Sequence, residues 1–409
     1  MTHPHIADAL KIPDLVRLTD GMVLLRFESM KIYSALAAVR HLLDQGTIRT
    51  GQTLIDSSSG IYAYALALAC HRYGLRCHIV GSTTVDATTL AQLEILGATV
   101  EQVRPSQNLK LDQEMRVRRV REILAERPDV HWMRQYHDAI HYLGYQEVAD
   151  LVTTALPDHS LTVVGGVGSG ASTGGLVRHL RRRDPGVRLV GVQPFGSVTF
   201  GSQDHHDPEA IIAGIGSSIP FDNVRHHLYD AVHWMDFTHA MSGAVALLRE
   251  HAVFAGLSTG AAYLTATYES RRHPDRLHLV IGADTGHRYV ERVYARHREA
   301  ADLAALKPTE VGSPEEMTMP WSTTAWNRAP WPSPGRRPAH DRGLPGIAHL
   351  RAGPPDARRR PAGRAAAAAD PRSRLLRARV GAAARGRRRR GGDRDLRHGT
   401  GGGAARPYP

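Results

Sequence analysis

The chain reads Gly165-Gly166-Val167-Gly168-Ser169-Gly170-Ala171-Ser172-Thr173-Gly174-Gly175 between an apolar run at 161–164 and a predicted helix at 172–183. Glycines let the backbone approach an anion closely, and the free N–H groups at the start of a helix attract negative charge. Ser169 and Ser172 add hydroxyl donors. Because no Gly-Lys-Ser/Thr occurs, the stretch is not a Walker P-loop, and it matches a dinucleotide fingerprint only weakly. It predicts a phosphate-binding loop; the alternative is a plain glycine-rich turn.

Short apolar runs alternate with longer amphipathic segments on both sides of this loop. The runs are continuous in Val, Ile and Leu, which is typical of strands buried on both faces of a parallel sheet. We expect strands at 22–27, 53–55, 77–80, 99–103, 130–133, 161–164, 189–192 and 277–281. We expect helices at 31–45, 60–73, 86–96, 111–126, 141–155, 172–183, 237–251, 258–269 and 287–302. The alternation predicts an α/β protein of two domains, each with a mostly parallel sheet flanked by helices, and a ligand cleft between them.

The positive charge of the chain belongs to its C-terminal end. Residues 317–409 hold 21 Arg, no Lys and five Asp, a net charge of +16, so residues 1–316 carry −4 of the total of +12. We therefore expect no nucleic-acid or membrane partner for the globular part. Residues 311–409 are rich in Arg, Ala, Gly and Pro, and we expect a tail that forms no core. Two interpretations stay open: a disordered basic arm, or a GC-rich reading frame translated out of register.

The cysteine content and the N-terminus indicate a cytoplasmic protein. Cys70 and Cys77 lie in one apolar stretch and are too few for a disulfide framework. The first residues lack the basic and apolar regions of a secretory signal. No run of 18 apolar residues occurs that could span a membrane.

Three further places carry candidate chemistry. Lys31 stands between a predicted strand and a predicted helix among apolar neighbours, where a lysine can lose its proton for Schiff-base chemistry; the alternative is a solvated lysine. The hydroxyls and N–H groups of residues 58–60 at a helix start can hold a carboxylate, unless they only cap the helix. Thr285, after the last predicted strand, offers a hydroxyl to a ring nitrogen, unless it only caps a turn.

These segments resemble, in their order and spacing, the cysteine synthase family of fold-type II pyridoxal-phosphate enzymes, which share the tryptophan synthase β-like fold. Lys31 precedes Gly46 by 15 residues, as the Schiff-base lysine of that family precedes a matching glycine. Residues 58–60 are similar to part of the substrate loop TSGNTG, and residues 168–172 to the phosphate loop GTGGT. Weaker similarities occur at 13–18, 96–98, 135–136, 141–147, 191–194, 214–216 and 256–262. The resemblance covers roughly residues 12–300.

The resemblance implies pyridoxal 5′-phosphate as cofactor and an amino acid as small-molecule substrate. Lys31 would hold the cofactor as a Schiff base, and Thr285 would bond its pyridine nitrogen. The residues implied to hold the phosphate are Gly168, Ser169, Gly170, Ala171 and Ser172. The residues implied to contact substrate are Ser58, Ser59, Gly60, Ile61 and Gln135. A homodimer is implied as well, with a larger cofactor-binding domain at 1–30 and 134–310, a smaller mobile domain with the substrate loop at 31–133, and the tail at 311–409.

The implied activity is β-replacement. Lys31 would remove the α-proton of an activated serine, O-acetylserine or O-phosphoserine, and a sulfur or other nucleophile would then add to the β-carbon to give cysteine or a related β-substituted alanine. Three departures put the substrate in question. The family segment NPTG before the lysine is shortened or missing. The family asparagine that bonds the cofactor oxygen falls on Ile61 and the next threonine on Tyr62, and the family's aspartate-arginine after the lysine becomes Ile32-Tyr33. Two alternatives therefore stay open: a β-eliminating serine or threonine dehydratase, and an inert regulatory homologue that binds the cofactor.

Overall fold

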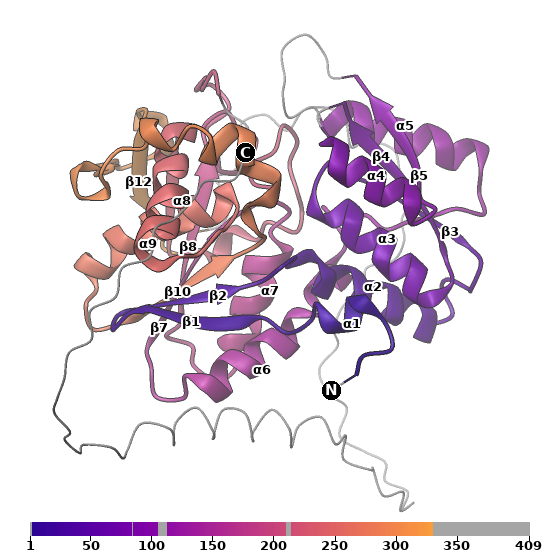
Figure 1. The fold of residues 1–409 in the computed structure, drawn as a ribbon, viewed down its shortest axis with the longest axis horizontal. Coiled ribbons are helices and arrows are strands. Elements are labelled where there is room, and N and C mark those ends of the chain that lie inside the picture. Colours follow the sequence, from indigo (N-terminus) through magenta and orange to yellow (C-terminus); the bar gives the residue numbers. More distant parts are fainter. Residues whose placement is uncertain (1, 84, 105–112, 210–213, 330–409) are drawn as a thin grey trace, which may run out of the picture. The chain divides into compact units, whose positions relative to one another are not determined.

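The computed structural model describes residues 2–83, 85–104, 113–209 and 214–329, and these residues build two sheets with helices around them (Figure 1). The larger sheet has the strand order β1-β2-β10-β7-β8-β9-β12-β11. Its strands are β1 (Asp14–Thr19), β2 (Met22–Arg26), β7 (Leu161–Gly166), β8 (Arg188–Pro194), β9 (Ala231–Met235), β10 (Leu277–Gly282), β11 (Thr309–Glu310) and β12 (Trp321–Ala325). The strands from β2 to β9 pair in parallel, whereas β1 and β12 pair antiparallel at the two sides.

The smaller sheet is entirely parallel, with the order β5-β4-β3-β6. Its strands are β3 (Thr53–Ser57), β4 (Arg76–Ser82), β5 (Thr99–Val103) and β6 (His131–Trp132). The helices are α1 (Ile6–Ala9), α2 (Lys31–Asp44), α3 (Ile61–Tyr73), α4 (Ala87–Ile95), α5 (Gln113–Glu126), α6 (Tyr145–Ala155), α7 (Ala171–Leu180), α8 (Phe237–His251) and α9 (Leu257–Arg272). The predicted α/β fold with mostly parallel sheets flanked by helices is confirmed. No helix among the described residues is long and apolar enough to cross a membrane.

The two faces of the larger sheet carry different apolar clusters. On β7, Val163 belongs to the cluster that includes α7, whereas Val164 belongs to the cluster of α8 and α9. Successive side chains of a strand point to opposite faces, so α7 and the α8–α9 pair cover opposite sides of the sheet. Burial on both faces is the reason why the strand sequences are continuously apolar.

The helix expected at 287–302 does not form. Short 3₁₀ and π turns occupy this part of the chain instead, at Gly286–Tyr289, Val290–Tyr294 and His297–Glu299. Two tyrosines hold these turns against the body: the Tyr294 hydroxyl donates to the Ala255 carbonyl at 2.5 Å, and the Tyr289 hydroxyl donates to Asp284 at 3.1 Å. These tertiary contacts override the local helix pattern.

The boundary of the predicted tail is corrected by β12. Residues 311–409 were expected to lie outside the fold, yet Trp321–Ala325 pairs with β9 and extends the larger sheet. The reason is the burial of the Trp321 side chain, which is 1% exposed and contributes far more apolar area than the polar residues beside it. Residues 330–409, which include most of the predicted tail, lie outside the described residues.

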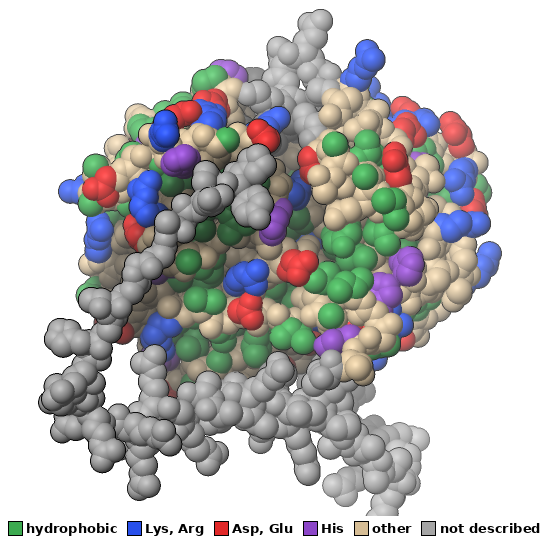
Figure 2. All heavy atoms as spheres, viewed as in Figure 1, with side chains coloured by type: hydrophobic (Ala, Val, Ile, Leu, Met, Phe, Trp, Pro, Cys, Tyr) green, Lys and Arg blue, Asp and Glu red, His purple; other side chains and the backbone are tan. Residues whose placement is uncertain are grey.

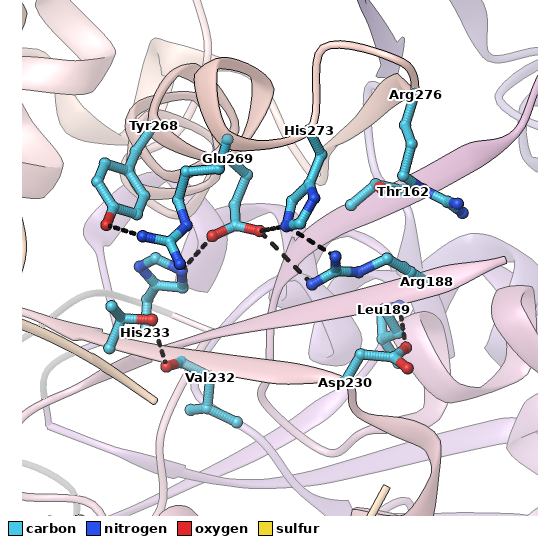
Figure 3. Close-up of polar contacts among 12 residues, drawn as sticks. Thr162, Arg188, Leu189, Asp230, Val232, His233, Tyr268, Glu269, His273 and Arg276 are labelled. Carbon is cyan, nitrogen blue, oxygen red and sulfur yellow. Dashed lines mark hydrogen bonds and ion pairs between the residues drawn. The ribbon is translucent and has the colours of Figure 1, made fainter. Parts of the chain in front are cut away.

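A buried polar cluster around Glu269 of α9 includes His233, His273 and Arg188 (Figure 3). The Trp321 indole donates from Nε1 to His233 Nδ1 at 3.1 Å, so His233 carries its proton on Nε2, which lies 3.3 Å from Glu269 Oε1. Burial raises the pKa of Glu269, but His233, Arg188 and His273 outweigh burial and hold that pKa below its usual value. The carboxylate therefore stays charged and joins β8, β9 and α9.

We predict that Trp321→Ala lowers the free energy of unfolding by about 3–5 kcal/mol, because it removes a large buried side chain and leaves a cavity. Urea denaturation followed by circular dichroism measures this difference. Ala325→Ser on the exposed position of the same strand is the matched control and should change it by less than about 0.5 kcal/mol. An unchanged stability of Trp321→Ala would mean that β12 is not part of the folded unit.

Candidate functional site

Lys31 lies where three parallel strands of the larger sheet end. Lys31, Ser169 and Thr285 stand in the segments that follow β2, β7 and β10. These segments lie at the same edge of the sheet, because the carboxyl ends of parallel strands meet there. The Lys31 Nζ atom lies 3.0 Å from Ser169 Oγ. Burial lowers the pKa of Lys31 to about 8. A large fraction of this amine is therefore neutral near pH 8, as a nucleophile or base requires.

The glycine-rich loop connects β7 to α7, and its glycines at positions 168 and 170 pack against neighbouring backbone. A Cβ atom on Gly168 would lie 2.2 Å from the Gly214 carbonyl oxygen, and one on Gly170 would lie 2.3 Å from the Asn223 carbonyl oxygen. Gly170 also has a φ of +79°, which L side chains rarely adopt. The loop thus brings its backbone N–H groups to the N-terminus of α7, where an anion is favoured.

The predicted substrate loop connects β3 to α3 in the smaller sheet. Ser58 Oγ accepts a hydrogen bond from the Ala63 N–H at 3.1 Å, and Ser59 Oγ accepts one from the Ser82 N–H at 2.8 Å. Ser59 Oγ also accepts from Arg116 Nη1 of α5 at 2.9 Å. The hydroxyls therefore hold the loop in place, while its glycine at position 60 faces the cleft.

Gln135 is buried beside the same loop. Its Nε2 donates to the Ser57 carbonyl at 2.6 Å, and its backbone N–H donates to Asp56 Oδ2 at 2.9 Å. Burial raises the pKa of Asp56 to about 6. Gln135 is thus fixed against the end of β3.

One cleft of about 410 Å³ brings most of the predicted site residues together. Its lining includes Lys31, Ser58, Ser59, Gly60, Ile61, Gln135, Gly168 and Ser169. Ser172 lines an adjoining pocket of about 50 Å³, together with Lys31 and Gly168. The remaining predicted residues, Gly170, Ala171 and Thr285, do not line either space. The Thr285 hydroxyl instead lies 3.0 Å from His287 Nδ1.

Five charged residues of the site were missed by the sequence analysis. Asp86, Arg116, Arg288 and Arg292 line the large cleft, and Asp284 lines the adjoining pocket. Burial raises the pKa of Asp284 to about 6, and its Oδ1 has no hydrogen-bond partner within the described part of the chain. Arg288 and Arg292 gave no local signal, since many exposed arginines surround them in the sequence. Asp284 directly precedes Thr285, which was predicted. Its position after the last predicted strand was the one sign in the sequence that it could belong to the site.

The glycine loop and Lys31 together fit a ligand that has a phosphate group and an aldehyde. The loop leads into the N-terminus of α7, where free backbone N–H groups favour an anion, and Gly168 and Ser172 line the pocket beside Lys31. Lys31 offers a buried amine of lowered pKa next to that loop. Pyridoxal phosphate has both groups, so the residues present fit this cofactor.

Comparisons with known proteins agree with this arrangement. Residues 23–281 match the family model of pyridoxal-phosphate dependent enzymes. The chain is 32% identical over 324 residues to the N-(2-amino-2-carboxyethyl)-L-glutamate synthase of Ralstonia nicotianae, which covers 74% of this chain and 95% of that protein. It is 35% identical over 299 residues to the synthase of the same name from Cupriavidus metallidurans, which covers 68% of this chain and 84% of that protein.

Solved structures show the same fold. The O-acetylserine dependent cystathionine beta-synthase of Helicobacter pylori superposes with a TM-score of 0.65 at 22% identity, over 72% of this chain and 99% of that one. The cysteine synthase of Entamoeba histolytica superposes with a TM-score of 0.64 at 19% identity, over 77% and 94% of the two chains. The fold is therefore that of the cysteine-synthase-like enzymes, as the sequence predicted. With the family model matching well over half of its length, the chain belongs to the pyridoxal-phosphate-dependent enzymes.

Proposed function

We propose that this enzyme replaces the phosphate of O-phosphoserine with the amino group of an acidic amino acid. Two relatives are named N-(2-amino-2-carboxyethyl)-L-glutamate synthase. A product of that name has a three-carbon amino-acid unit on the nitrogen of glutamate, which is what β-replacement on an activated serine by the glutamate amine yields. O-acetylserine and a sulfur nucleophile are the main alternatives within the same chemistry.

The charge of the cleft is the observation that carries this proposal. The described surface mixes basic and acidic side chains on the face drawn in Figure 2. The charged side chains that line the large cleft are, in contrast, mostly basic: Arg116, Arg288 and Arg292, beside Lys31, which would hold the cofactor. The one acid of the lining, Asp86, pairs with Arg288. A cationic cleft favours substrates with more than one anionic group: O-phosphoserine carries a phosphate and a carboxylate and glutamate carries two carboxylates, whereas O-acetylserine has one carboxylate and HS⁻ a single charge.

Arg116 would recognise the phosphate of the donor. Its side chain is buried, and its Nη1 donates to Ser59 Oγ of the substrate loop at 2.9 Å. A guanidinium presents several N–H donors in one plane and matches the oxygens of a phosphate. Since the substrate loop would hold the carboxylate of the same donor, Arg116 is well placed to bind its leaving group.

The roles of the other residues follow from their positions. Gly168, Ser169, Gly170, Ala171 and Ser172 would hold the cofactor phosphate at the start of α7. When bound, pyridoxal phosphate supplies the electron sink that stabilises negative charge on the α-carbon of the substrate. Lys31 would hold the cofactor and then take the α-proton on its Nζ, for which a pKa of about 8 is suitable. Ile61 lacks a hydrogen-bonding side chain and would contribute only apolar contact.

We predict that the cofactor-free protein takes up pyridoxal phosphate faster as pH rises from 7 to 9, with a midpoint near 8. The neutral amine of Lys31 attacks the aldehyde, and protonation below the lowered pKa blocks it. Stopped-flow absorbance of the bound cofactor measures the rate. Lys31→Arg is the control and should give no covalent uptake. A rate that is independent of pH in this range would contradict the role of Lys31.

We predict that Arg116→Gln lowers kcat/KM for O-phosphoserine about 10- to 100-fold, the effect expected when a hydrogen bond to a charged group worth about 1.5–3 kcal/mol is lost. With O-acetylserine as donor the decrease should be at least fivefold smaller. Arg118→Gln, an exposed position on the same helix, is the matched control. Mass spectrometry of the product formed with glutamate measures both rates.

Three results would contradict the proposal. Equal decreases of kcat/KM for O-phosphoserine and O-acetylserine in Arg116→Gln would mean that Arg116 does not bind the donor phosphate. Product formation with sulfide but not with any amino acid would make the protein a cysteine synthase. Release of pyruvate from the donor alone, with no replacement product, would make it a dehydratase.

A further inference from the structure

Two arginines of the cleft stand beyond Thr285 on the turns that replace the expected helix. Arg288 belongs to the turn Gly286–Tyr289 and Arg292 to the turn Val290–Tyr294. Both line the large cleft that also contains Lys31. Neither is used by the donor site described above, in which Arg116 faces the leaving group.

Arg288 is oriented by Asp86 of the smaller sheet's domain. Its Nε donates to Asp86 Oδ2 at 2.9 Å, and Asp86 itself caps α4 through Oδ1, which accepts from the Thr89 N–H at 2.9 Å. A Cβ atom on Gly60 would lie 3.8 Å from Arg288 Nη1, at van der Waals contact, so the guanidinium lies beside the predicted substrate loop. Within the described ranges, no acceptor pairs with its two Nη atoms.

Arg292 is four residues further on and is exposed at the cleft. It makes no ion pair with any described acidic residue. Its neighbour Arg296 differs, because Glu209 and Glu299 each bind it at 2.5 Å. Arg292 therefore offers a charged guanidinium to the cleft, whereas the charge of Arg296 is already neutralised by its two glutamates.

We propose that Arg288 and Arg292 form a subsite for the two carboxylates of the incoming acidic amino acid. This inference rests on the proposed function and adds the residues that select the nucleophile. A dicarboxylic amino acid has two anionic groups, and each guanidinium can bind one of them with two parallel hydrogen bonds. Apolar side chains of the same cleft, Phe237, Leu257 and Val293, offer contact for the methylene groups between them.

The subsite explains why the cleft would select an acid over its amide. Glutamine has the size and the amine of glutamate but lacks the second carboxylate, so it would leave one guanidinium without an anionic partner. Discrimination by a built polar site of this kind exceeds what shape alone provides. The selectivity for glutamate over glutamine therefore reports on the subsite directly.

The test compares glutamate with glutamine as nucleophile, at saturating donor, in the cofactor-loaded full chain. For the parent we expect a clear preference for glutamate in kcat/KM. Arg292→Gln should reduce the glutamate-to-glutamine ratio of kcat/KM by roughly tenfold or more, mainly through KM for glutamate, because one charge-assisted pair is lost. Arg298→Gln, an exposed arginine that lines neither pocket, is the matched control and should keep the ratio.

A binding measurement supports the kinetics independently of turnover. Glutamate without donor should raise the unfolding temperature of the loaded parent more than glutamine does, and this difference should be lost in Arg292→Gln and in Arg288→Gln. Cofactor absorbance of each variant checks that it folds and loads. If the parent prefers glutamate and both variants keep that preference and the temperature difference, the subsite is wrong while the proposed function stands. If the parent accepts no dicarboxylic amino acid, both are wrong.

Discussion

The contact between the Lys31 amine and the Ser169 hydroxyl, at 3.0 Å, joins two segments that lie 138 residues apart in the chain. It exists because β2, β7 and β10 pair in parallel and end at the same edge of the larger sheet. The predicted phosphate loop after β7 and the lysine after β2 are thereby placed next to each other. The smaller sheet contributes the predicted substrate loop to the same cleft, and the turns after β10 contribute two arginines.

The parallel core of the fold could be predicted from the sequence, and the sides of the larger sheet could not. Strands such as β7 and β10 are buried on both faces and read as continuous apolar runs. β12 contains Trp-Ser-Thr-Thr-Ala and has no such run; its pairing depends on the burial of Trp321 against His233, which is 88 residues away. The turns at 286–294 likewise follow from contacts of Tyr289 and Tyr294 with the body rather than from local pattern.

The structure brings Lys31, Gly168 and Ser169 of the predicted site to one cleft. A glycine loop before a helix and a lysine among apolar residues each carry their own signal in the sequence. On α5, Arg116 stands four and seven residues before Val120 and Ile123, so the helical period places it on the buried face and Arg118 on the other face. That Arg116, Arg288 and Arg292 line the same cleft as Lys31 depends on tertiary placement, which periodicity and spacing do not report.

The chemistry proposed for the cleft depends on Lys31 as the residue that holds the cofactor. The chain has four lysines, Lys11, Lys31, Lys110 and Lys307. Reduction of the cofactor-loaded protein with borohydride, followed by proteolysis and mass spectrometry, identifies the lysine that is linked to the cofactor. We predict that the pyridoxyl mass is found on the peptide that contains Lys31. Its presence on another lysine, or its absence from all four in a protein saturated with cofactor, would show that Lys31 does not hold the cofactor.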